Sequence, residues 1–276
     1  MGDPFPIQAD TAIADSNGIV YVTGGFIVDD CVVEGDDPGA VCALDANLRP
    51  RWMIRISDDS AGLNLLGGRL TVSRYPDVCI ALDPSTGAIL DADAPLLPTR
   101  MVPDEDGSFL SDHDGEVRRY RLGDRAGESE GLRFGFDRVP LFEPPPARGF
   151  FAKLFTSDEP PSADGTFPIA LGGGDLVTFQ SGPAALVRYD RAGNRSRFAS
   201  ISGEYRIDEI SDMQRSGELV FLRDGARLFC ARGGAVSNIA SIEDLTAFAA
   251  LPGGDLVLFG DQRVVLARRD EGYRVG

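Results

Sequence analysis

The stretch Gly67-Gly-Arg-Leu-Thr-Val-Ser-Arg-Tyr-Pro-Asp-Val-Cys-Ile-Ala-Leu-Asp-Pro-Ser-Thr-Gly87 contains two short apolar runs, and each adjoins a turn-forming sequence. The first run follows Gly67-Gly68, and the second precedes Asp83-Pro-Ser-Thr-Gly87. Glycine, asparagine and aspartate suit the backbone of tight turns, and aliphatic residues that follow such a turn are typical of a strand leaving a hairpin. The stretch therefore predicts consecutive antiparallel strands.

Both motifs recur along the chain in the same order. The turn followed by an apolar run is found at 17–22, 67–72, 106–110, 174–179, 217–222 and 254–259. The second β-prone run is found at 41–45, 79–83, 117–120, 186–190, 228–230 and 264–267. With one short segment before and one after, each unit of about forty residues holds four strands, which is the organisation of a propeller blade. We therefore predict an all-β fold: one six-bladed β-propeller domain spanning residues 1–276.

One step in the repeat is too long. Between the equivalent positions Tyr120 and Tyr189 the step is 69 residues, whereas the step from Leu44 to Leu82 is 38. The long step contains Glu143-Pro-Pro-Pro146 and Asp158-Glu-Pro-Pro-Ser162, and prolines at this density do not fit central strands. We interpret residues 138–166 as a Pro-rich insertion between blades three and four. The alternative is a seven-bladed propeller with one degenerate blade.

Two units resemble a known repeat. Ala81-Leu-Asp-Pro-Ser-Thr-Gly-Ala88, and Ala43-Leu-Asp45 with Trp52 downstream, resemble the quinoprotein-like (PQQ-like) propeller repeat, which has Ala-Leu-Asp-x-x-Thr-Gly followed by Trp. Members that use the quinone cofactor carry Trp in most blades and often two adjacent cysteines. This chain has one Trp, and no two of its cysteines are neighbours. The resemblance therefore implies a divergent member without the cofactor, similar to the assembly scaffolds among its bacterial relatives.

The charge of the chain is strongly negative, with a net value of −16. Residues 1–115 contain 20 acidic and 6 basic side chains, which gives −14, so the acid is concentrated in the first part of the chain. Such a field repels nucleic acid and anionic membranes and favours a partner with a basic surface. No long apolar stretch or basic, apolar leader is present at the N-terminus, which predicts a cytoplasmic protein.

Candidate catalytic or metal-binding residues are few. His113 is the only histidine and lies in a sequence typical of a turn, so we predict no catalytic residue and no zinc site. Asp104-Glu-Asp-Gly107 and Asp112-His-Asp-Gly115 have spaced carboxylates but do not continue as an EF-hand loop. One alternative stays open: a metal-dependent hydrolase or lactonase that holds calcium with channel carboxylates, because such residues would come from different blades and leave no local motif.

Two segments are candidates for contact with another protein. The loop Gly25–Ala40 joins the second and third strands of the first blade and is longer than its counterparts. Its acidic residues are Asp29, Asp30, Glu34, Asp36 and Asp37. The predicted insertion offers the aromatic residues Phe150, Phe151 and Phe155. Charged loops and aromatic patches are common in interfaces, so we predict a non-catalytic, protein-binding scaffold.

Overall fold

Every regular element that the structure describes is a β-strand. The computed structural model describes residues 7–26, 39–56, 60–74, 78–94, 100–104, 106–113, 115–124, 134–142, 163–181, 185–201, 207, 210–260 and 263–273. These ranges hold 23 strands and no helix. Within them, accordingly, nothing resembles an apolar helix of membrane-spanning length.

The strands group into antiparallel units in chain order, which we call blades 1 to 6. Blades 1 to 3 consist of β1 (Ile7–Ala14), β2 (Val20–Phe26), β3 (Gly39–Leu44), β4 (Pro50–Ile56); β5 (Ser60–Leu66), β6 (Arg69–Arg74), β7 (Val78–Leu82), β8 (Ile89–Ala94); and β9 (Val102–Pro103), β10 (Ser108–His113), β11 (Glu116–Asp124), β12 (Phe134–Val139). Blades 4 to 6 consist of β13 (Thr166–Gly172), β14 (Asp175–Gln180), β15 (Ala185–Tyr189), β16 (Arg195–Ser200); β17 (Asp212–Ser216), β18 (Leu219–Asp224), β19 (Arg227–Arg232), β20 (Ala235–Ser241); and β21 (Ala247–Ala250), β22 (Leu256–Gly260), β23 (Arg263–Ala267).

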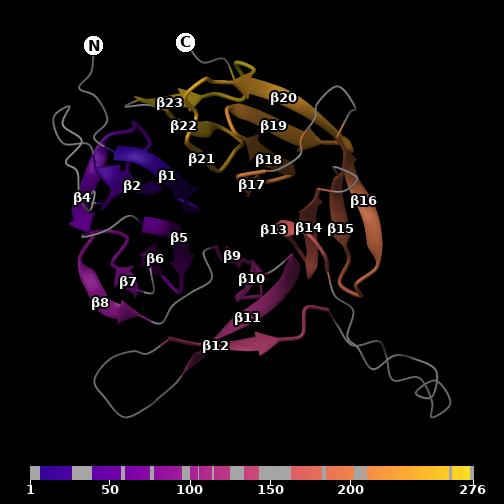
Figure 1. The fold of residues 1–276 in the computed structure, drawn as a ribbon, viewed down its shortest axis with the longest axis horizontal. Helices are drawn as coiled ribbons and strands as arrows, with labels where there is room; N and C mark the ends of the chain where they lie inside the picture. The colour runs from indigo at the N-terminus through magenta and orange to yellow at the C-terminus, as the bar shows by residue number, and fades with distance from the viewer. Residues whose placement is uncertain are drawn as a thin grey trace.

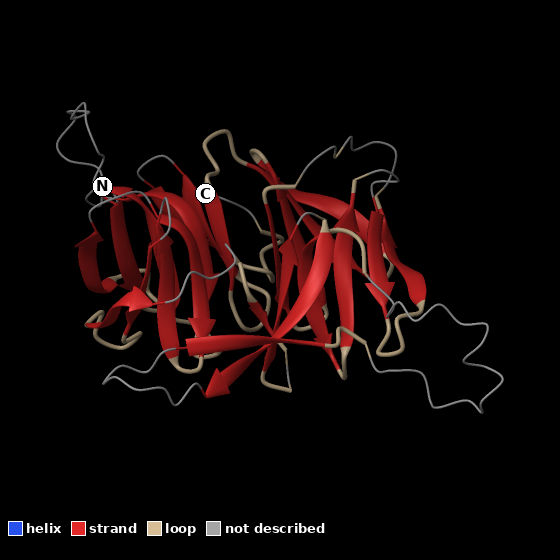
Figure 2. Ribbon diagram, turned by 60° about the horizontal axis from the view of Figure 1, so that its bottom comes forward, coloured by secondary structure: helices blue, strands red, loops and turns tan. Residues whose placement is uncertain are grey.

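The blades stand side by side around a common centre (Figure 1), with the first strand of each blade innermost and the last outermost. Seen from the side, the strands run between two ends of the ring, where the connections lie (Figure 2). One parallel pair, Ser200 with Ala235, joins the outer strands of blades 4 and 5. The prediction of an all-β propeller is confirmed.

The region predicted as an insertion lies only partly within the described residues. Residues 138 and 139 complete β12, Thr166 begins β13, and 143–162 lie outside the described residues. Phe142 and Ala163, at the two borders of this gap, are buried in one apolar cluster with residues of blades 3 and 4. The choice between an insertion and a degenerate seventh blade concerns 143–162 and stays a prediction.

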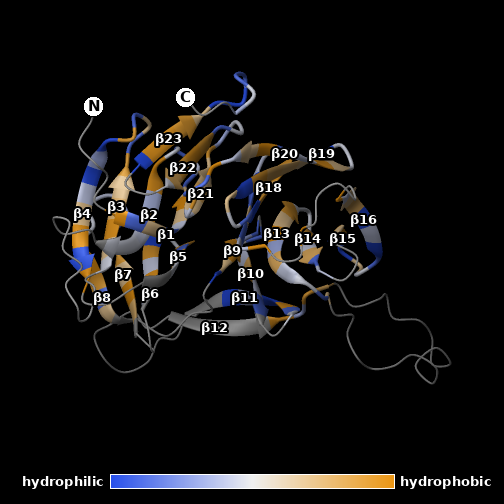
Figure 3. Cartoon of the chain, turned by 45° about the horizontal axis from the view of Figure 1, so that its top comes forward, coloured by the Kyte–Doolittle hydropathy of each residue, from blue (hydrophilic) through white to orange (hydrophobic). Residues whose placement is uncertain are grey.

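The apolar core lies between the blades. Among the described residues, six clusters of buried side chains are found, and each combines residues of two neighbouring blades, including the first and the last. Apolar residues accordingly run through the strands all around the ring (Figure 3). Blades 1 and 6 share no strand within the described residues, and the cluster containing Ile7, Val22, Val257 and Phe259 closes the ring. Burial of these side chains is the main favourable term in folding.

Strand β3 explains why the middle strands are continuous apolar runs instead of alternating ones. Ala40, Cys42 and Leu44 pack toward blade 6, whereas Val41 and Ala43 pack toward blade 2. Successive side chains of a strand point to opposite faces, so a strand between two neighbours must be apolar at every position. The same holds for β18, where Val220 and Leu219 belong to different clusters.

Trp52, the only tryptophan, connects blades 1 and 2. Its Nε1 donates a hydrogen bond of 3.0 Å to the carbonyl oxygen of Pro84, and its ring lies against Gly87. Gly87 has φ of +73°, and a Cβ there would lie 2.7 Å from Cε3 of Trp52. The turn therefore needs glycine both for its backbone conformation and for the approach of the indole.

We predict that Gly87→Ala destabilises the protein more than Gly68→Ala does. Gly68 also has positive φ, +78°, but a Cβ there would meet nothing within 4 Å. Both variants carry the backbone cost of about 1 kcal/mol, and Gly87→Ala adds about 1–3 kcal/mol from the clash with Trp52. Urea unfolding, followed by the fluorescence of Trp52, measures the free energy of unfolding of each variant. Equal destabilisation by the two variants would contradict the packing described here.

Aspartates stabilise the turns between the third and fourth strands of several blades. Oδ1 of Asp45 accepts hydrogen bonds from the backbone N–H of Arg49, at 2.9 Å, and of Asn47, at 2.8 Å. These bonds, chiefly the one from Arg49, lower the pKa of Asp45. The pKa values of Asp83 and Asp190 are lowered too, first by side-chain hydrogen bonds and then by similar backbone bonds.

Because these pKa values lie below the unfolded-state value of about 3.9, the carboxylates stabilise the fold above that pH and lose this contribution as the pH falls through the folded pKa. We therefore expect the combined variant Asp45→Asn, Asp83→Asn and Asp190→Asn to be less stable than the wild type at neutral pH. The difference should shrink below a pH of about 4. Urea midpoints measured across this range provide the check, and a pH-independent difference would contradict it.

Candidate functional site

A cavity of about 320 Å³ lies at the centre of the ring. Its lining includes residues at the beginning of inner strands, such as Phe167 of β13, Asp212 of β17 and Ala247 of β21. The cavity therefore lies toward the end of the channel where the inner strands start. Its polar lining residues are Asp10, Thr11, Arg100, Asp112, Ser211, Asp212, Gln214 and Arg223, and its apolar ones are Ala12, Ile13, Leu63, Phe167 and Ala247.

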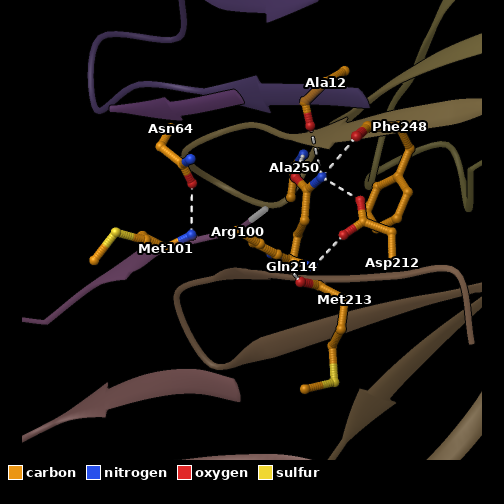
Figure 4. A network of polar contacts seen from close by, with 9 residues as sticks. All are labelled: Ala12, Asn64, Arg100, Met101, Asp212, Met213, Gln214, Phe248 and Ala250. Carbon is orange, nitrogen blue, oxygen red and sulfur yellow. Dashed lines mark hydrogen bonds and ion pairs between the residues drawn. The ribbon is translucent and has the colours of Figure 1, made fainter. Parts of the chain in front are cut away.

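Arg100 connects two blades across this cavity. It lies two residues before the start of β9, yet its Nη1 forms an ion pair with Oδ1 of Asp212 and its Nη2 donates to the carbonyl oxygen of Met213, both on β17 (Figure 4). Its guanidinium carbon lies 5.6 Å from the centre of the Phe167 ring, a distance typical of a cation–π contact. Arg100 and Asp212 therefore neutralise each other within the cavity wall.

Phe167 has a strained backbone. Its φ is +52°, the left-handed region that bulky residues rarely occupy, and Pro168 follows it. The pairing of β13 with β14 shifts register between Thr166 and Ile169, so the strain falls in a bulge. Such strain costs about 1–3 kcal/mol and is often found at functional sites, where the surrounding structure holds it. Here it coincides with the cavity wall.

Gln214 joins three blades in the channel. Its Nε2 donates to the carbonyl oxygens of Ala12 on β1, at 2.9 Å, and of Phe248 on β21, at 2.7 Å, and lies 2.7 Å from Oδ2 of Asp212. Its Oε1 accepts a hydrogen bond of 3.0 Å from the backbone N–H of Ala250. Figure 4 shows the side chain at the centre of this network. Its hydrogen-bonding capacity is used by the fold, so we assign it a structural role.

Arg223 is the least satisfied cation of the cavity. Its Nη1 has only two long contacts of 3.5 Å, with the carbonyl oxygens of Gly225 and Leu245, and its buried Nε has no hydrogen-bond partner within the described residues. Burial lowers its pKa, and the nearby charges of Asp212 and Asp10 act in the opposite direction. A buried donor without a partner is costly, so the guanidinium of Arg223 is poorly stabilised by the fold.

The described residues contain no set of side chains suited to catalysis by a metal ion. Among them, no group of three or more His, Cys, Asp and Glu residues is placed to hold a metal. Asp212, a channel carboxylate of the type that the calcium hypothesis requires, is bound to Arg100 and Gln214.

Three cysteines, Cys42, Cys79 and Cys230, are buried, and burial raises the pKa of each thiol, which opposes thiolate formation.

The partner-binding residues predicted from the sequence, Asp29, Asp30, Glu34, Asp36, Asp37, Phe150, Phe151 and Phe155, lie outside the described residues. The points where their segments leave the blades are described. The first connection runs from the end of β2 to the start of β3, where Gly25 pairs with Gly39. Gly25 also pairs with Gln8, near the start of the inner strand β1. The first connection therefore leaves the blade at the end where its inner strand begins. The second connection leads into the start of β13. Both connections therefore leave from the end of the ring toward which the cavity lies.

Sequence reasoning missed most of the cavity residues. It considered Asp112 only as part of a possible calcium loop, whereas the structure places it on β10 in the cavity wall. Arg100, Phe167, Asp212, Gln214 and Arg223 were not singled out. A signal exists for one of them: Arg223 follows four buried apolar residues, Leu219 to Leu222, in β18. Polar residues in such strands mark a channel or a hydrogen-bond network.

Comparison with known proteins gives a likeness in fold only. No protein-family model and no curated protein matches the sequence. Solved structures do match. One is a structural genomics protein of unknown function from Bacteroides thetaiotaomicron VPI-5482, at 11% identity and a TM-score of 0.52, covering 96% of this chain and 70% of that protein.

Two further structures have names that state a role for those proteins. A catalytically inactive virginiamycin B lyase from Staphylococcus aureus, solved with quinupristin, has 7% identity and a TM-score of 0.49 over 95% of this chain and 94% of that one. BamB from Moraxella catarrhalis has 14% identity and a TM-score of 0.45 over 94% and 84%. Identities this low reflect shared fold and carry no argument about function.

We predict that Gln214→Ala destabilises the protein by about 2–4 kcal/mol, because it leaves buried backbone groups of β1 and β21 without partners. The matched control is Gln8→Ala, which removes an exposed glutamine side chain from β1, one of the strands that Gln214 contacts. It should change stability by less than about 0.5 kcal/mol. Urea unfolding measures both values. Similar values for the two variants would contradict the linking role of Gln214.

Proposed function

We propose that this chain is a non-catalytic β-propeller that binds another protein through the end of the ring where the inner strands begin. The observation that carries the proposal is the common exit of the two long connections at this end, next to the cavity. The opposite end holds the short turns at Asp15, Asp45, Asp83 and Asp190, whose hydrogen bonds are internal. Binding residues are typically found on longer connections held by a rigid scaffold.

The charge of the chain supports a partner with a basic surface. The first connection carries Asp29, Asp30, Glu34, Asp36 and Asp37 within a chain of net charge −16. A concentration of one sign of charge accelerates encounter with a surface of opposite sign and opposes binding to nucleic acid. Phe150, Phe151 and Phe155 would supply the apolar anchors that such an interface requires. Action without a cofactor and a cytoplasmic location remain predictions from the sequence.

The test begins with capture of the partner from the native host, its identification by mass spectrometry and its purification. Binding of the purified partner is then measured for the wild type and for a variant with Asp29→Asn, Asp36→Asn and Asp37→Asn. We expect the dissociation constant to rise about tenfold or more at low salt, with a smaller effect at high salt. A second variant, with Phe150, Phe151 and Phe155 replaced by serine, should weaken binding at both salt concentrations.

The control neutralises three exposed acidic residues elsewhere on the chain, Glu218, Asp270 and Glu271. Glu218 belongs to the hairpin between β17 and β18, at the end of the ring opposite the proposed binding face. This variant should bind as the wild type does. Loss of binding in the control but not in the two test variants would place the interface elsewhere and overturn the proposal.

A further inference from the structure

The cavity in the channel has a charge imbalance of its own. Three carboxylates, Asp10, Asp112 and Asp212, and two guanidinium groups, Arg100 and Arg223, line it, so its formal charge is −1. Arg100 and Asp212 form an ion pair within the wall. Asp10 lies close enough to Arg223 for its charge to act on the pKa of Arg223, in the upward direction. Asp112 is thus the carboxylate left over in this sum, and within the described residues its carboxylate has no hydrogen-bond or ion-pair partner.

Arg223 presents the complementary requirement. Its buried Nε has no acceptor within the described residues, and the contacts of its Nη1 are long. Asp112 belongs to blade 3 and Arg223 to blade 5, so the two groups approach the cavity from different sides of the ring. A ligand that satisfies both must carry a positive charge at one point and a hydrogen-bond acceptor at another.

The rest of the wall limits the size and character of such a ligand. Ile13, Leu63, Phe167 and Ala247 give the cavity an apolar surface between the charged groups. A volume of about 320 Å³ accommodates a small molecule and lies at the lower end of ordinary ligand pockets. Arg100 contacts the ring of Phe167, and Gln214 fixes three blades around the cavity, so the wall is held in place before any ligand arrives.

We propose that the cavity binds a small primary ammonium compound that also carries a carbonyl or similar acceptor, with the ammonium at Asp112 and the acceptor at the guanidinium group of Arg223, which lines the cavity. This site is distinct from the protein-binding loops proposed above and does not depend on them. The ammonium group would neutralise the excess charge, and the acceptor would give the Arg223 guanidinium a closer partner than the 3.5 Å contacts of its Nη1. An aliphatic body attached to the same carbon as these two groups would cover the apolar wall.

Three probes with the same aliphatic body separate the two requirements. L-Leucinamide carries both an ammonium group and a carbonyl, 3-methylbutylamine carries only the ammonium group, and 4-methylpentanamide carries only the amide. Thermal unfolding of the full chain is followed with each probe. We expect L-leucinamide to raise the midpoint most, by about 3 °C at ten times its dissociation constant, 3-methylbutylamine to raise it less, and 4-methylpentanamide to leave it unchanged.

Variants test the assignment of each group. Asp112→Asn should abolish the response to both amines, while Glu218→Gln, at an exposed position far from the cavity, should leave it unchanged. Arg223→Lys keeps the charge but removes the planar guanidinium and its fork of donors, so it should bring the response to L-leucinamide close to that of 3-methylbutylamine. If Arg223→Lys does not fold, the Asp112→Asn comparison still decides, because it changes the opposite side of the cavity.

Three outcomes would overturn the proposal: no response to either amine at concentrations up to about 10 mM, the range in which ligands with millimolar dissociation constants are detected; a response to 4-methylpentanamide as large as that to L-leucinamide; or an unchanged response in Asp112→Asn. None of these results bears on protein binding through the loops. That function is tested with a separate partner and separate variants, so the two proposals fail independently.

Discussion

The fold depends on one constraint: the middle strands of each blade are apolar on both faces, so a blade needs a neighbour on each side. In β3, alternate residues belong to two different clusters, one shared with blade 6 and the other with blade 2. A row of such blades would leave apolar surface at its two ends. Closing the row into a ring removes both ends, and the cluster between blades 1 and 6 does this without a shared strand within the described residues.

Closure of the ring also creates the site. It brings the innermost strands to a common centre, where no blade can fill the space alone and where polar backbone groups at strand ends need partners. Gln214 and Arg100 supply those partners across blades. Arg100 also contacts the ring of Phe167, whose strained backbone lies beside the cavity. The poorly satisfied guanidinium of Arg223 and the excess carboxylate therefore lie in the wall of one cavity.

The two kinds of candidate site differ in how far the sequence reveals them. The acidic loop with Asp29 to Asp37 is contiguous, so its composition can be recognised directly, although these residues lie outside those that the structure describes. The cavity is assembled from single residues of different blades. The sequence around Asp112 indicates only a spacing of carboxylates, which is unrelated to the position of Asp112 in the cavity wall. Arg100 precedes a strand of two residues, which is too short to be predicted from a sequence pattern.

The sequence by itself determined the strands, the turns and their recurrence, because hairpin glycines, turn aspartates and doubly buried apolar runs are encoded within a few consecutive residues. The propeller fold follows from that recurrence. Only the tertiary structure decided which side chains meet in the channel. Arg100 and Asp212 are 112 residues apart and become partners solely because the ring closes. Local patterns fix what each blade is, whereas the chemistry at the centre depends on how all the blades are arranged together.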